Sequence, residues 1–319
     1  MPNDVFSDVL QLVGAQSVMS GGFAAGGAWA LRFPGPDKIR FAAVLQGTCW
    51  LHIEGEDAAI RVQTGDVALL VTPRPFVLAS DLSVPPLDAQ SVICAQPDAV
   101  VTLGDGAGCM QLGGHIALNP LNGDFLAAAL PPLIYVRATS PHAADLQWLI
   151  RKLAREQQEN QPGERVAAQQ IVQLMFVELL RAHLAAQGAF PPGWLRALAD
   201  PRLLPSLRLM HGEPGRNWAL PELARACAMS VTTFNLRFRA SVGRTPLAYL
   251  TEWRMRLAER ALRESDVAVA AVGRSLGYTS ESAFSHAFKR VIGHAPRSWR
   301  RAHTATVAAT GLAGKLAGS

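Results

Sequence analysis

The spacing of hydrophobic residues changes twice along this chain. Residues 1–20 carry an apolar spacing, at Val5, Val9, Leu12 and Val13, that predicts a short helix. From Trp29 to about Val136 the apolar residues instead form short runs broken by Gly, Pro and Asp, as in FAAVLQGTCWLHI (41–53) and AIRVQTGDVALLV (59–71). Many short strands separated by turn residues are typical of a β-barrel or a β-sandwich.

The apolar residues then recur every three or four positions, which predicts amphipathic helices over 142–158 and 164–187. The connection NQPG is short, so the two helices should be antiparallel. The stretch GAFPPG (188–193) is a Gly/Pro hinge and the expected domain boundary. Residues 194–302 have a helical pattern throughout. The Ala/Gly/Thr-rich tail 304–319 has no large apolar stripe, and we predict that it is disordered.

Charge separates the chain into an acidic and a basic part. Residues 1–200 hold 12 Lys and Arg against 18 Asp and Glu, a balance of −6, whereas residues 201–303 hold 17 against 7, a balance of +10. A basic domain beside an acidic one is typical of a protein that binds nucleic acid. A charged helical domain with no such partner would have the same balance, so charge alone leaves both interpretations open.

Composition places the chain among globular intracellular proteins. Apolar residues make up 49% of the 319 residues, enough for two domains with separate cores. The four cysteines are scattered, with no close pair at metal-ligand spacing, which favours reduced thiols. The N-terminus lacks a signal pattern, and no window approaches about 18 uninterrupted apolar residues. We therefore expect a soluble cytoplasmic protein that does not bind a membrane.

Two segments of the basic part repeat each other. AMSVTTFNLRFRASVGRTP (228–246) and GYTSESAFSHAFKRVIGHAP (277–296) share two phenylalanines four residues apart, followed by a Gly and a Pro, at a constant offset of 50 residues. Each copy predicts a helix, a tight turn and a second helix, with Ser230 and Ser280 as the N-caps of the second helices. The second copy carries one additional residue, Thr279, in its turn.

The second helix of each copy has a face of phenylalanines, which should face the core, and an opposite polar face. Small polar side chains on an exposed helix can enter the major groove of DNA and bond to base edges, and basic residues at its far end can meet phosphates. We predict base readout by Thr232, Asn235, Leu236, Ser282, Ser285 and His286, and phosphate contacts by Arg237, Arg239, Lys289 and Arg290. An ordinary surface helix is the alternative, but the repeat and the charge together favour DNA.

At this point the sequence resembles the AraC/XylS family of bacterial transcription regulators. The resemblance rests on WALPELARACAMS, FNLRFRASVGRTPLAYL, WRMRLAERALRESDVAVAAVG and GYTSESAFSHAFKRVIGHAPRSWR, which together span about 218–300. It implies two helix-turn-helix units joined by a long helix that begins at Thr245 and Pro246 and runs to about Glu264. It also implies that the two recognition helices occupy successive major grooves, about 34 Å apart.

Three residues depart from the family pattern. Leu236 stands where arginine is frequent on the first recognition helix, so readout there should be weaker or partly apolar. Ala228 stands where the first turn usually has glycine; if that position needs a positive φ, the strain is on the order of 1 kcal/mol. Gly273 replaces an alanine in the second unit, which should weaken its helix by roughly 1 kcal/mol.

The N-terminal half resembles, less specifically, the cupin-like domain found on one branch of this family, through WALRFPGPDKIRFAAVLQGTCWLHI, TGDVALLVTPRP and LPPLIYV. Metal-binding cupins use clustered histidines and a carboxylate. Here only His52 and His115 fall among the predicted strands, and only Glu54 accompanies His52, so we expect no metal, no cofactor and no catalysis. We predict an effector pocket lined by Trp29, Phe41, Trp50, His52 and Arg74, although a core would also account for most of these aromatic residues.

Together these patterns predict an α+β protein of two domains, with an N-terminal cupin-like β-barrel followed by helices and a C-terminal all-α domain with two helix-turn-helix units. The expected parts are a sensor barrel at 1–140, a helical dimerisation and relay segment with a linker at 141–190, a DNA-binding domain at 191–303 and a tail at 304–319.

We interpret the chain as a homodimeric transcription regulator, associated with the nucleoid, that binds double-stranded promoter DNA. It would sense an unidentified small molecule or partner and activate transcription by binding beside RNA polymerase. Two alternatives remain open: a barrel that binds no ligand and only assembles the protein, and a metal-dependent cupin enzyme fused to a DNA-binding domain.

Overall fold

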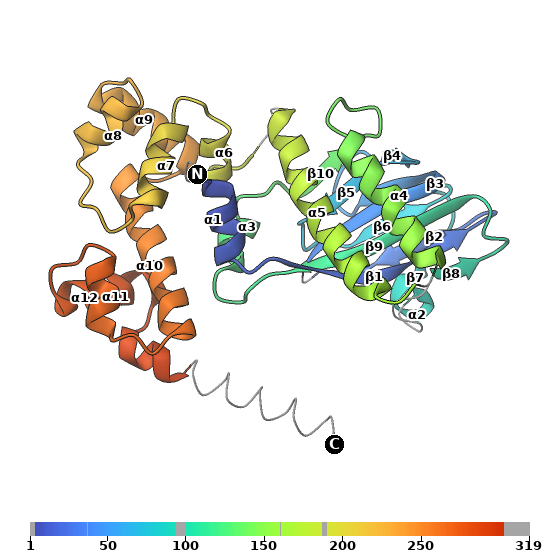
Figure 1. Ribbon diagram of the computed structural model, residues 1–319. Coiled ribbons are helices and arrows are strands. Elements are labelled where there is room, and N and C mark those ends of the chain that lie inside the picture. The colour runs from blue at the N-terminus through green and yellow to red at the C-terminus, as the bar shows by residue number, and fades with distance from the viewer. Residues whose placement is uncertain (1–3, 37, 94–99, 160, 187–189, 303–319) are drawn as a thin grey trace, which may run out of the picture. The chain divides into compact units, whose positions relative to one another are not determined.

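The computed structural model describes residues 4–302 apart from 37, 94–99, 160 and 187–189. The chain divides into two compact units, one of residues 13–191 and one of residues 1–12 together with 192–319. The first unit is a curled sheet with helices, and the second is helical, which confirms the predicted fold class (Figure 1). The tail for which disorder was predicted lies outside the described residues, as do the first residues of the Gly/Pro hinge.

The larger unit is built on one curled sheet. Its strands are β1 (Gln16–Ala25), β2 (Ala30–Phe33), β3 (Ile39–Ile53), β4 (Ile60–Gln63), β5 (Val67–Leu70), β6 (Phe76–Ala79), β7 (Leu87–Asp88), β8 (Val100–Leu103), β9 (Cys109–Ala117) and β10 (Leu133–Val136). They follow the order β7-β2-β6-β3-β9-β1-β8, with β4, β5 and β10 paired off this path. Two short helices, α2 (Ala89–Ile93) and α3 (Gly123–Ala127), lie between strands.

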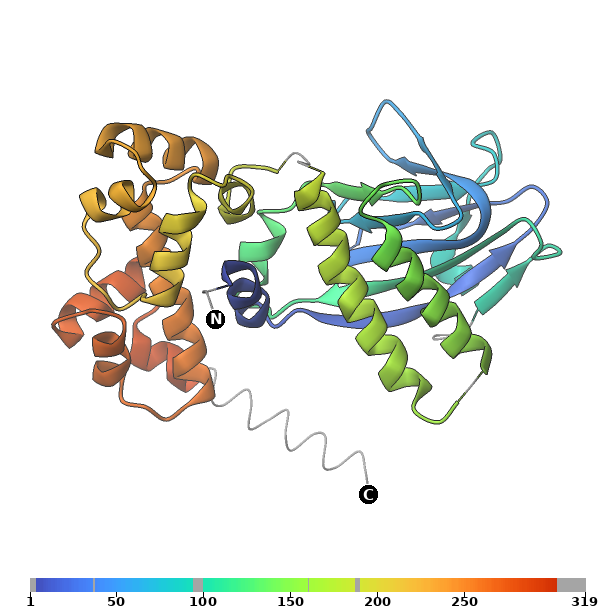
Figure 2. The same cartoon turned by 45° about the horizontal axis from the view of Figure 1, so that its top comes forward.

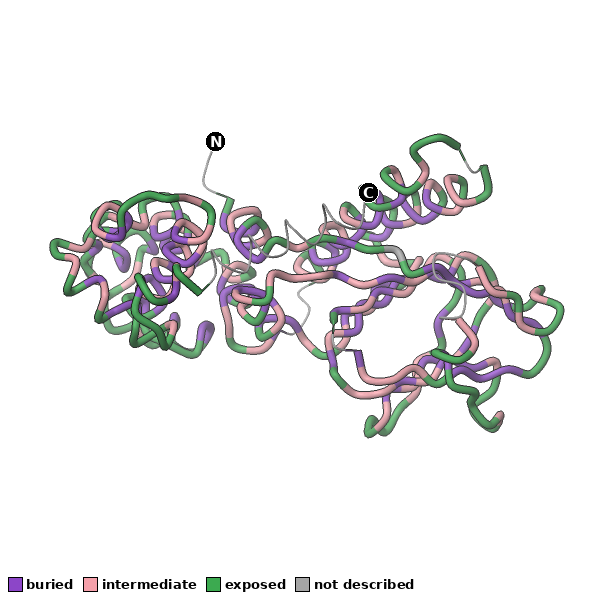
Figure 3. The backbone as a smooth tube through the Cα atoms, turned by 90° about the horizontal axis from the view of Figure 1, so that it is seen from below, coloured by how far each residue is buried: buried purple, intermediate pink, exposed green. Residues whose placement is uncertain are grey.

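Strand β3 makes the sheet curl, because its two halves pair with different neighbours. The first half pairs with β5 and β9, and the second half pairs with β4 and β6. The register against β9 shifts between Val44 and Gln46. Such a bulge adds a residue to one strand, bends it and increases its twist. The strands therefore curve around an interior (Figure 3), where a cluster of buried apolar side chains forms the core of this unit.

Two helices cover one outer face of the sheet, as Figure 2 shows. They are α4 (Ala144–Glu159) and α5 (Glu164–Ala185), within two residues of the predicted bounds. Helix α5 packs on β1 and β10, and α4 packs along α5. A hydrogen-bonded anchor fixes α5 to the sheet, since both the backbone N–H and the hydroxyl of Ser17 donate to Oε1 of Gln173, at 3.0 and 2.9 Å.

The smaller unit contains both helix-turn-helix motifs. Its helices are α1 (Val5–Leu12), α6 (Trp194–Leu198), α7 (Leu204–Gly212), α8 (Leu220–Ala226), α9 (Val231–Val242), α10 (Pro246–Glu264), α11 (Val269–Ser275) and α12 (Glu281–Ile292). Helices α8 and α9 form the first motif, α11 and α12 form the second, and α10 joins them. Ser230 and Ser280 cap α9 and α12 as predicted, accepting backbone N–H groups at 3.2 and 3.1 Å.

The repeated phenylalanines form the core of each motif. Phe234 and Phe238 on α9, and Phe284 and Phe288 on α12, are completely buried. Helix α10 begins at Pro246, with Thr245 as its N-cap, and ends at Glu264, as the resemblance implied. Helix α10 packs against α9 of the first motif and against both α11 and α12 of the second. The polar faces of α9 and α12 are therefore the faces that packing leaves open.

The first helix of the chain belongs to the helical unit and not to the sheet unit. The sensor barrel was expected to begin at residue 1, but α1 packs on α6, α7 and α10. Its apolar side chains are buried, and Phe6 lies against Trp194 with ring centroids 6.3 Å apart. Asp8 Oδ2 lies 3.5 Å from Nδ1 of His211, a buried side chain on α7. The apolar stripe identified in the sequence is thus a docking face for the helical unit.

The turn of the first motif has the strain that the sequence suggested. Ala228 has φ 52°, and among the described residues it is the one non-glycine residue with positive φ. The corresponding turn of the second motif has Gly277, with φ 85°. Ala228 is exposed, so its methyl group contributes little packing. An L-residue in this region is strained by on the order of 1 kcal/mol, and glycine is not.

We therefore expect Ala228→Gly to stabilise the helical unit by about 0.5–1 kcal/mol, because the relief of strain exceeds the entropy that glycine adds to the unfolded chain. The measurement is urea unfolding followed by circular dichroism. The matched control is Ala248→Gly, at an exposed position in α10 with ordinary helical geometry, which should lose about 0.5–1 kcal/mol. Equal destabilisation by both substitutions would contradict the strain.

Gly273, which stands where the family usually has alanine, has a packing role. A Cβ added at Gly273 in α11 would lie 3.0 and 3.1 Å from Cγ and Cβ of Phe284, which is buried. The glycine therefore lets α12 approach α11 closely. The helix propensity that alanine would add is offset by displacement of the Phe284 ring.

Candidate nucleic-acid interface

The structure exposes most of the residues predicted to read bases. On α9, Thr232 and Leu236 are exposed, and Leu236 has 65% of its surface accessible. On α12, Ser282 and His286 are exposed. Asn235 and Ser285 are only half-buried, and the Oδ1 atom of Asn235 is buried without a hydrogen-bond partner among the described residues. The exposed faces of the two helices thus centre on Leu236 and His286.

The predicted phosphate contacts separate into paired and unpaired cations. The Arg237 Nε donates to Asp200 Oδ2 at 2.6 Å, and this carboxylate raises the pKa of Arg237. Arg239, Lys289 and Arg290 are exposed, and none forms an ion pair with a described residue. Elsewhere in the unit Glu and Asp neutralise several arginines, as in the pairs Arg216–Glu222, Arg244–Glu252, Arg263–Glu264 and Arg297–Glu281. The recognition helices therefore keep unneutralised positive charge.

A groove beside α12 contains residues that the sequence pattern did not single out. Its lining includes Thr251 and Arg254 of α10 together with His286 and Arg290 of α12, around an open volume of about 570 Å³. The Arg254 guanidinium donates to the backbone carbonyls of Pro214 and Arg216. Arg254 thus fixes a loop beside the recognition helix. Only tertiary packing brings α10 and α12 together, so no local signal could have identified these residues.

The sheet unit contains a separate cavity of about 320 Å³. Of the five residues predicted to line an effector pocket, Phe41 lines it. Trp29 packs in the core against Phe23, at a centroid distance of 5.2 Å. His52 contacts the backbone oxygen of Glu56, and Arg74 pairs with the Glu56 side chain outside the cavity. Trp50 points to the same face of β3 as His52 and is also not part of the lining. Four of the five predicted residues therefore lie away from this cavity.

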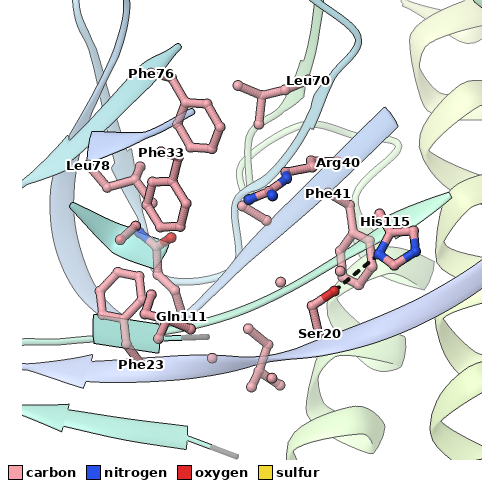
Figure 4. A pocket seen from close by; sticks show the side chains of 18 of the residues that line it. Ser20, Phe23, Phe33, Arg40, Phe41, Leu70, Phe76, Leu78, Gln111 and His115 are labelled. Atoms are coloured by element: carbon pink, nitrogen blue, oxygen red, sulfur yellow. Dashed lines mark hydrogen bonds between the residues drawn. The ribbon is translucent and has the colours of Figure 1, made fainter. Parts of the chain in front are cut away.

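The cavity is lined by residues from β1, β2, β3, β5, β6 and β9 and from α2, together with the β2–β3 connection. Figure 4 shows Arg40, Gln111, His115 and Ser20 beside a group of apolar side chains. The hydroxyl of Ser20 lies 3.2 Å from Nδ1 of His115. Within the part of the chain that the structure describes, no three His, Cys, Asp or Glu side chains gather in a way that could hold a metal ion. None of the described helices is both long and apolar enough to cross a membrane.

Comparison with known proteins agrees with both halves of this description. Residues 4–185 match the family described as Cupin, and residues 223–302 match the family described as Helix-turn-helix domain. A protein of Streptomyces lividans named as an AraC-like transcription regulator is 38% identical over 298 residues, which cover 93% of this chain and 98% of the relative. The chain belongs to the AraC-like transcription regulators.

Two further proteins are similar to this chain. The HTH-type transcriptional regulator AlkR of Acinetobacter baylyi is 30% identical over 286 residues, 86% of this chain and 92% of its own length. The DNA-binding domain of AdpA, solved in complex with a target DNA, is 30% identical, spans 34% of this chain and 96% of that domain, and has a TM-score of 0.33. As an AraC-like regulator, the protein combines a helix-turn-helix DNA-binding domain with an N-terminal domain of the ligand-binding type.

Proposed function

We propose that this AraC-like regulator activates transcription as a homodimer whose DNA binding is controlled by a small molecule held in the sheet unit. The observation that carries the proposal is the pair of matched motifs with open, cationic recognition faces on α9 and α12. A single recognition helix reads only a few base pairs, whereas two joined by α10 would read successive major grooves. Activation would follow from binding beside RNA polymerase, and the names of the relatives as regulators favour binding over catalysis.

Effector control is supported by the cavity in the sheet unit. Helix α1 belongs to the helical unit, and the chain passes directly from α1 into β1. Residues Ser20–Phe23 of β1 line the cavity. A ligand that changes β1 would therefore act on a strand covalently joined to a helix of the DNA-binding unit. A ligand shifts such an equilibrium only if it binds the two states with different affinity.

Homodimerisation is supported by apolar side chains on the outer face of α4 and α5. Trp148, Val166 and Leu174 are exposed by 58%, 65% and 44%. The other members of the predicted apolar set, including Ile171, Met175 and Leu180, are buried or half-buried. A large aromatic and two aliphatic side chains on one helix pair are typical of a surface that a partner covers. A second copy of the chain would cover them symmetrically.

We expect Leu174→Glu to convert the dimer into a monomer, because a carboxylate at an apolar interface must be desolvated. Light scattering coupled to size exclusion gives the mass directly. Leu247→Glu is the matched control, since Leu247 on α10 is exposed by 43% in the other unit, and the mass should stay dimeric. A dimer that survives Leu174→Glu would remove this face from the proposal.

Sequence-specific recognition is tested with His286, which is exposed on α12 beside the groove. The cognate site would be taken from genomic DNA fragments that are enriched by binding to the protein. We expect His286→Ala to weaken binding there by about 1–3 kcal/mol and to change binding to random DNA little. His294→Ala, at an exposed histidine just beyond α12, should leave both unchanged. Equal losses on cognate and random DNA would show that His286 does not discriminate between bases.

A further inference from the structure

The cavity in the sheet unit has an apolar wall on one side. Phe23, Phe33, Leu70, Phe76 and Leu78 line it, and the rings of Phe33 and Phe76 are stacked with centroids 4.7 Å apart. Its volume is about 320 Å³. Apolar cavities of about 150 Å³ hold a benzene ring, so this one has room for about two fused rings. The wall alone would accept any compact apolar molecule.

Arg40 adds a positive charge that no described residue neutralises. It is half-buried on β3, opposite His115 of β9, and its guanidinium lies 5.9 Å from the centre of the Phe33 ring (Figure 4). Arg32 and Arg74 of the same unit pair instead with Glu54 and Glu56. A cation shielded from water is costly unless an anion pairs with it. The exposed Lys38 lines the same cavity and adds to the positive potential.

Gln111 provides a second polar group that needs a partner. Its side chain is 2% exposed, and Nε2 donates to the thiol sulfur of Cys49 at 2.8 Å. Its Oε1 is buried and has no hydrogen-bond partner among the described residues. The amide extends into the cavity toward Phe33 (Figure 4). A buried acceptor without a donor is unfavourable, so an occupant whose O–H or N–H group reaches it would be favoured.

We propose that the cavity binds an organic anion with a flat apolar body of about two rings and a hydrogen-bond donor. The anionic group pairs with Arg40, the rings lie against Phe33 and Phe76, and the donor bonds to Oε1 of Gln111. This inference rests on the proposed effector control and gives the effector a chemical class. An apolar cation would meet Arg40 and Lys38 with the same sign of charge, and a neutral molecule would leave Arg40 unpaired.

The test uses the full chain and two matched probes, 6-hydroxy-2-naphthoate and the uncharged 6-hydroxy-2-naphthalenemethanol, in isothermal titration calorimetry. We expect the acid to bind at least tenfold more tightly than the alcohol. Arg40→Met should remove that difference, because it should weaken binding of the acid at least tenfold and binding of the alcohol less than threefold. Arg40→Lys should retain part of the difference. Arg61→Met, which removes an exposed arginine outside the cavity, should leave both affinities unchanged.

A second variant locates the site. Ala42 lines the cavity, so Ala42→Leu should reduce the affinity for both probes by filling the space. Thermal unfolding checks that the Ala42→Leu variant folds. If it does not fold, the comparison of Arg40→Met with Arg61→Met decides whether the acid binds in this cavity. The inference is overturned if the acid does not bind at millimolar concentration, if it binds no better than the alcohol, or if Arg40→Met binds it like the wild type.

Binding to DNA separates this inference from the function on which it rests. If the acid binds through Arg40 but leaves affinity for the cognate site unchanged, the anion site stands and effector control is wrong. If an inducer in cells changes reporter expression while the acid fails to bind, effector control stands and the anion class is wrong.

Discussion

A fragment of residues 192–302 is expected to be much less stable than the same helices in the whole chain, because it lacks α1. Val5, Phe6, Val9 and Leu12 are all buried, by 93% or more of their surface. Burying such a side chain stabilises the folded state by about 1.5–3 kcal/mol. The unfolded chain already buries part of that surface, so the total for the four side chains is smaller than their sum. The loss should be on the order of 5 kcal/mol, comparable to the whole stability of a small domain. Urea unfolding of the fragment and of the full chain measures it.

The polar contact made by α1 also disappears in the fragment. His211 stacks on Trp253 with centroids 4.0 Å apart, and its Nε2 lies 2.7 Å from the Tyr249 hydroxyl. Burial lowers the pKa of His211, and the nearby Asp8 carboxylate opposes that effect. A histidine whose pKa is lowered by folding destabilises the fold as pH falls below its unfolded value of about 6.5, because the unfolded chain binds the proton more readily. Removal of the Asp8 carboxylate alone, with α1 kept in place, should make this loss of stability larger.

A fusion provides the control for this prediction. Residues 4–12 joined to 192–302 through a flexible Gly/Ser linker should recover most of the lost stability. The same fusion with Val9→Asp should not, since a carboxylate would replace a side chain that is completely buried. If the fragment without α1 unfolds at the same urea concentration as the fusion, α1 is not part of the folding unit.

The sequence predicted the helical unit in detail because its signals are local. Ser230, Ser280 and Pro246 begin helices, and paired phenylalanines four residues apart identify the buried faces. Each of these signals depends on residues within one or two turns. The association of α1 with this unit depends instead on contacts more than 180 residues away, and an amphipathic pattern does not say which surface it covers.

Most residues predicted to line an effector pocket lie away from the cavity for a different physical reason. Arg40 and Ala42 line the cavity and Val44 belongs to the interior core, so even-numbered residues face the interior in the first half of β3. Phe41 also borders the cavity. Cys49, Leu51 and Ile53 belong to the interior core, so odd-numbered residues face it in the second half. The bulge between them reverses the alternation and turns Trp50 and His52 outward. Gly47, with φ 80°, was the sequence signal for an irregular strand.

The residues expected to read bases were chosen by their predicted exposure. Packing changes the surroundings of some of them in ways that the sequence pattern alone could not predict. Asn235 is at the right helical position, but its Oδ1 is buried. Arg237 is also at the expected end of α9, yet Asp200, 37 residues earlier, holds its guanidinium. Leu236 is exposed by 65%, which favours apolar contact with a thymine methyl group there. We therefore expect hydrogen bonds to bases to come mainly from α12.

Removing both charges at the end of α12 should have the largest effect on DNA affinity. Lys289 and Arg290 are exposed and form no ion pair with a described residue, so no carboxylate competes with phosphate for them. If each neutralises one phosphate, Lys289→Gln with Arg290→Gln should reduce the slope of log K against log salt by roughly two units. At about 0.15 M salt the affinity should fall roughly thirtyfold on cognate and random DNA alike. Fluorescence anisotropy at several salt concentrations gives both values.

A double variant with the same change in net charge distinguishes local contact from the general field of the domain. Arg216 and Arg263 already pair with Glu222 and Glu264 in the same unit. Arg216→Gln with Arg263→Gln removes two positive charges whose field those carboxylates largely cancel, so the salt slope should remain that of the wild type. Equal slopes for the two double variants would mean that long-range charge, and not phosphate contact by α12, determines the salt dependence.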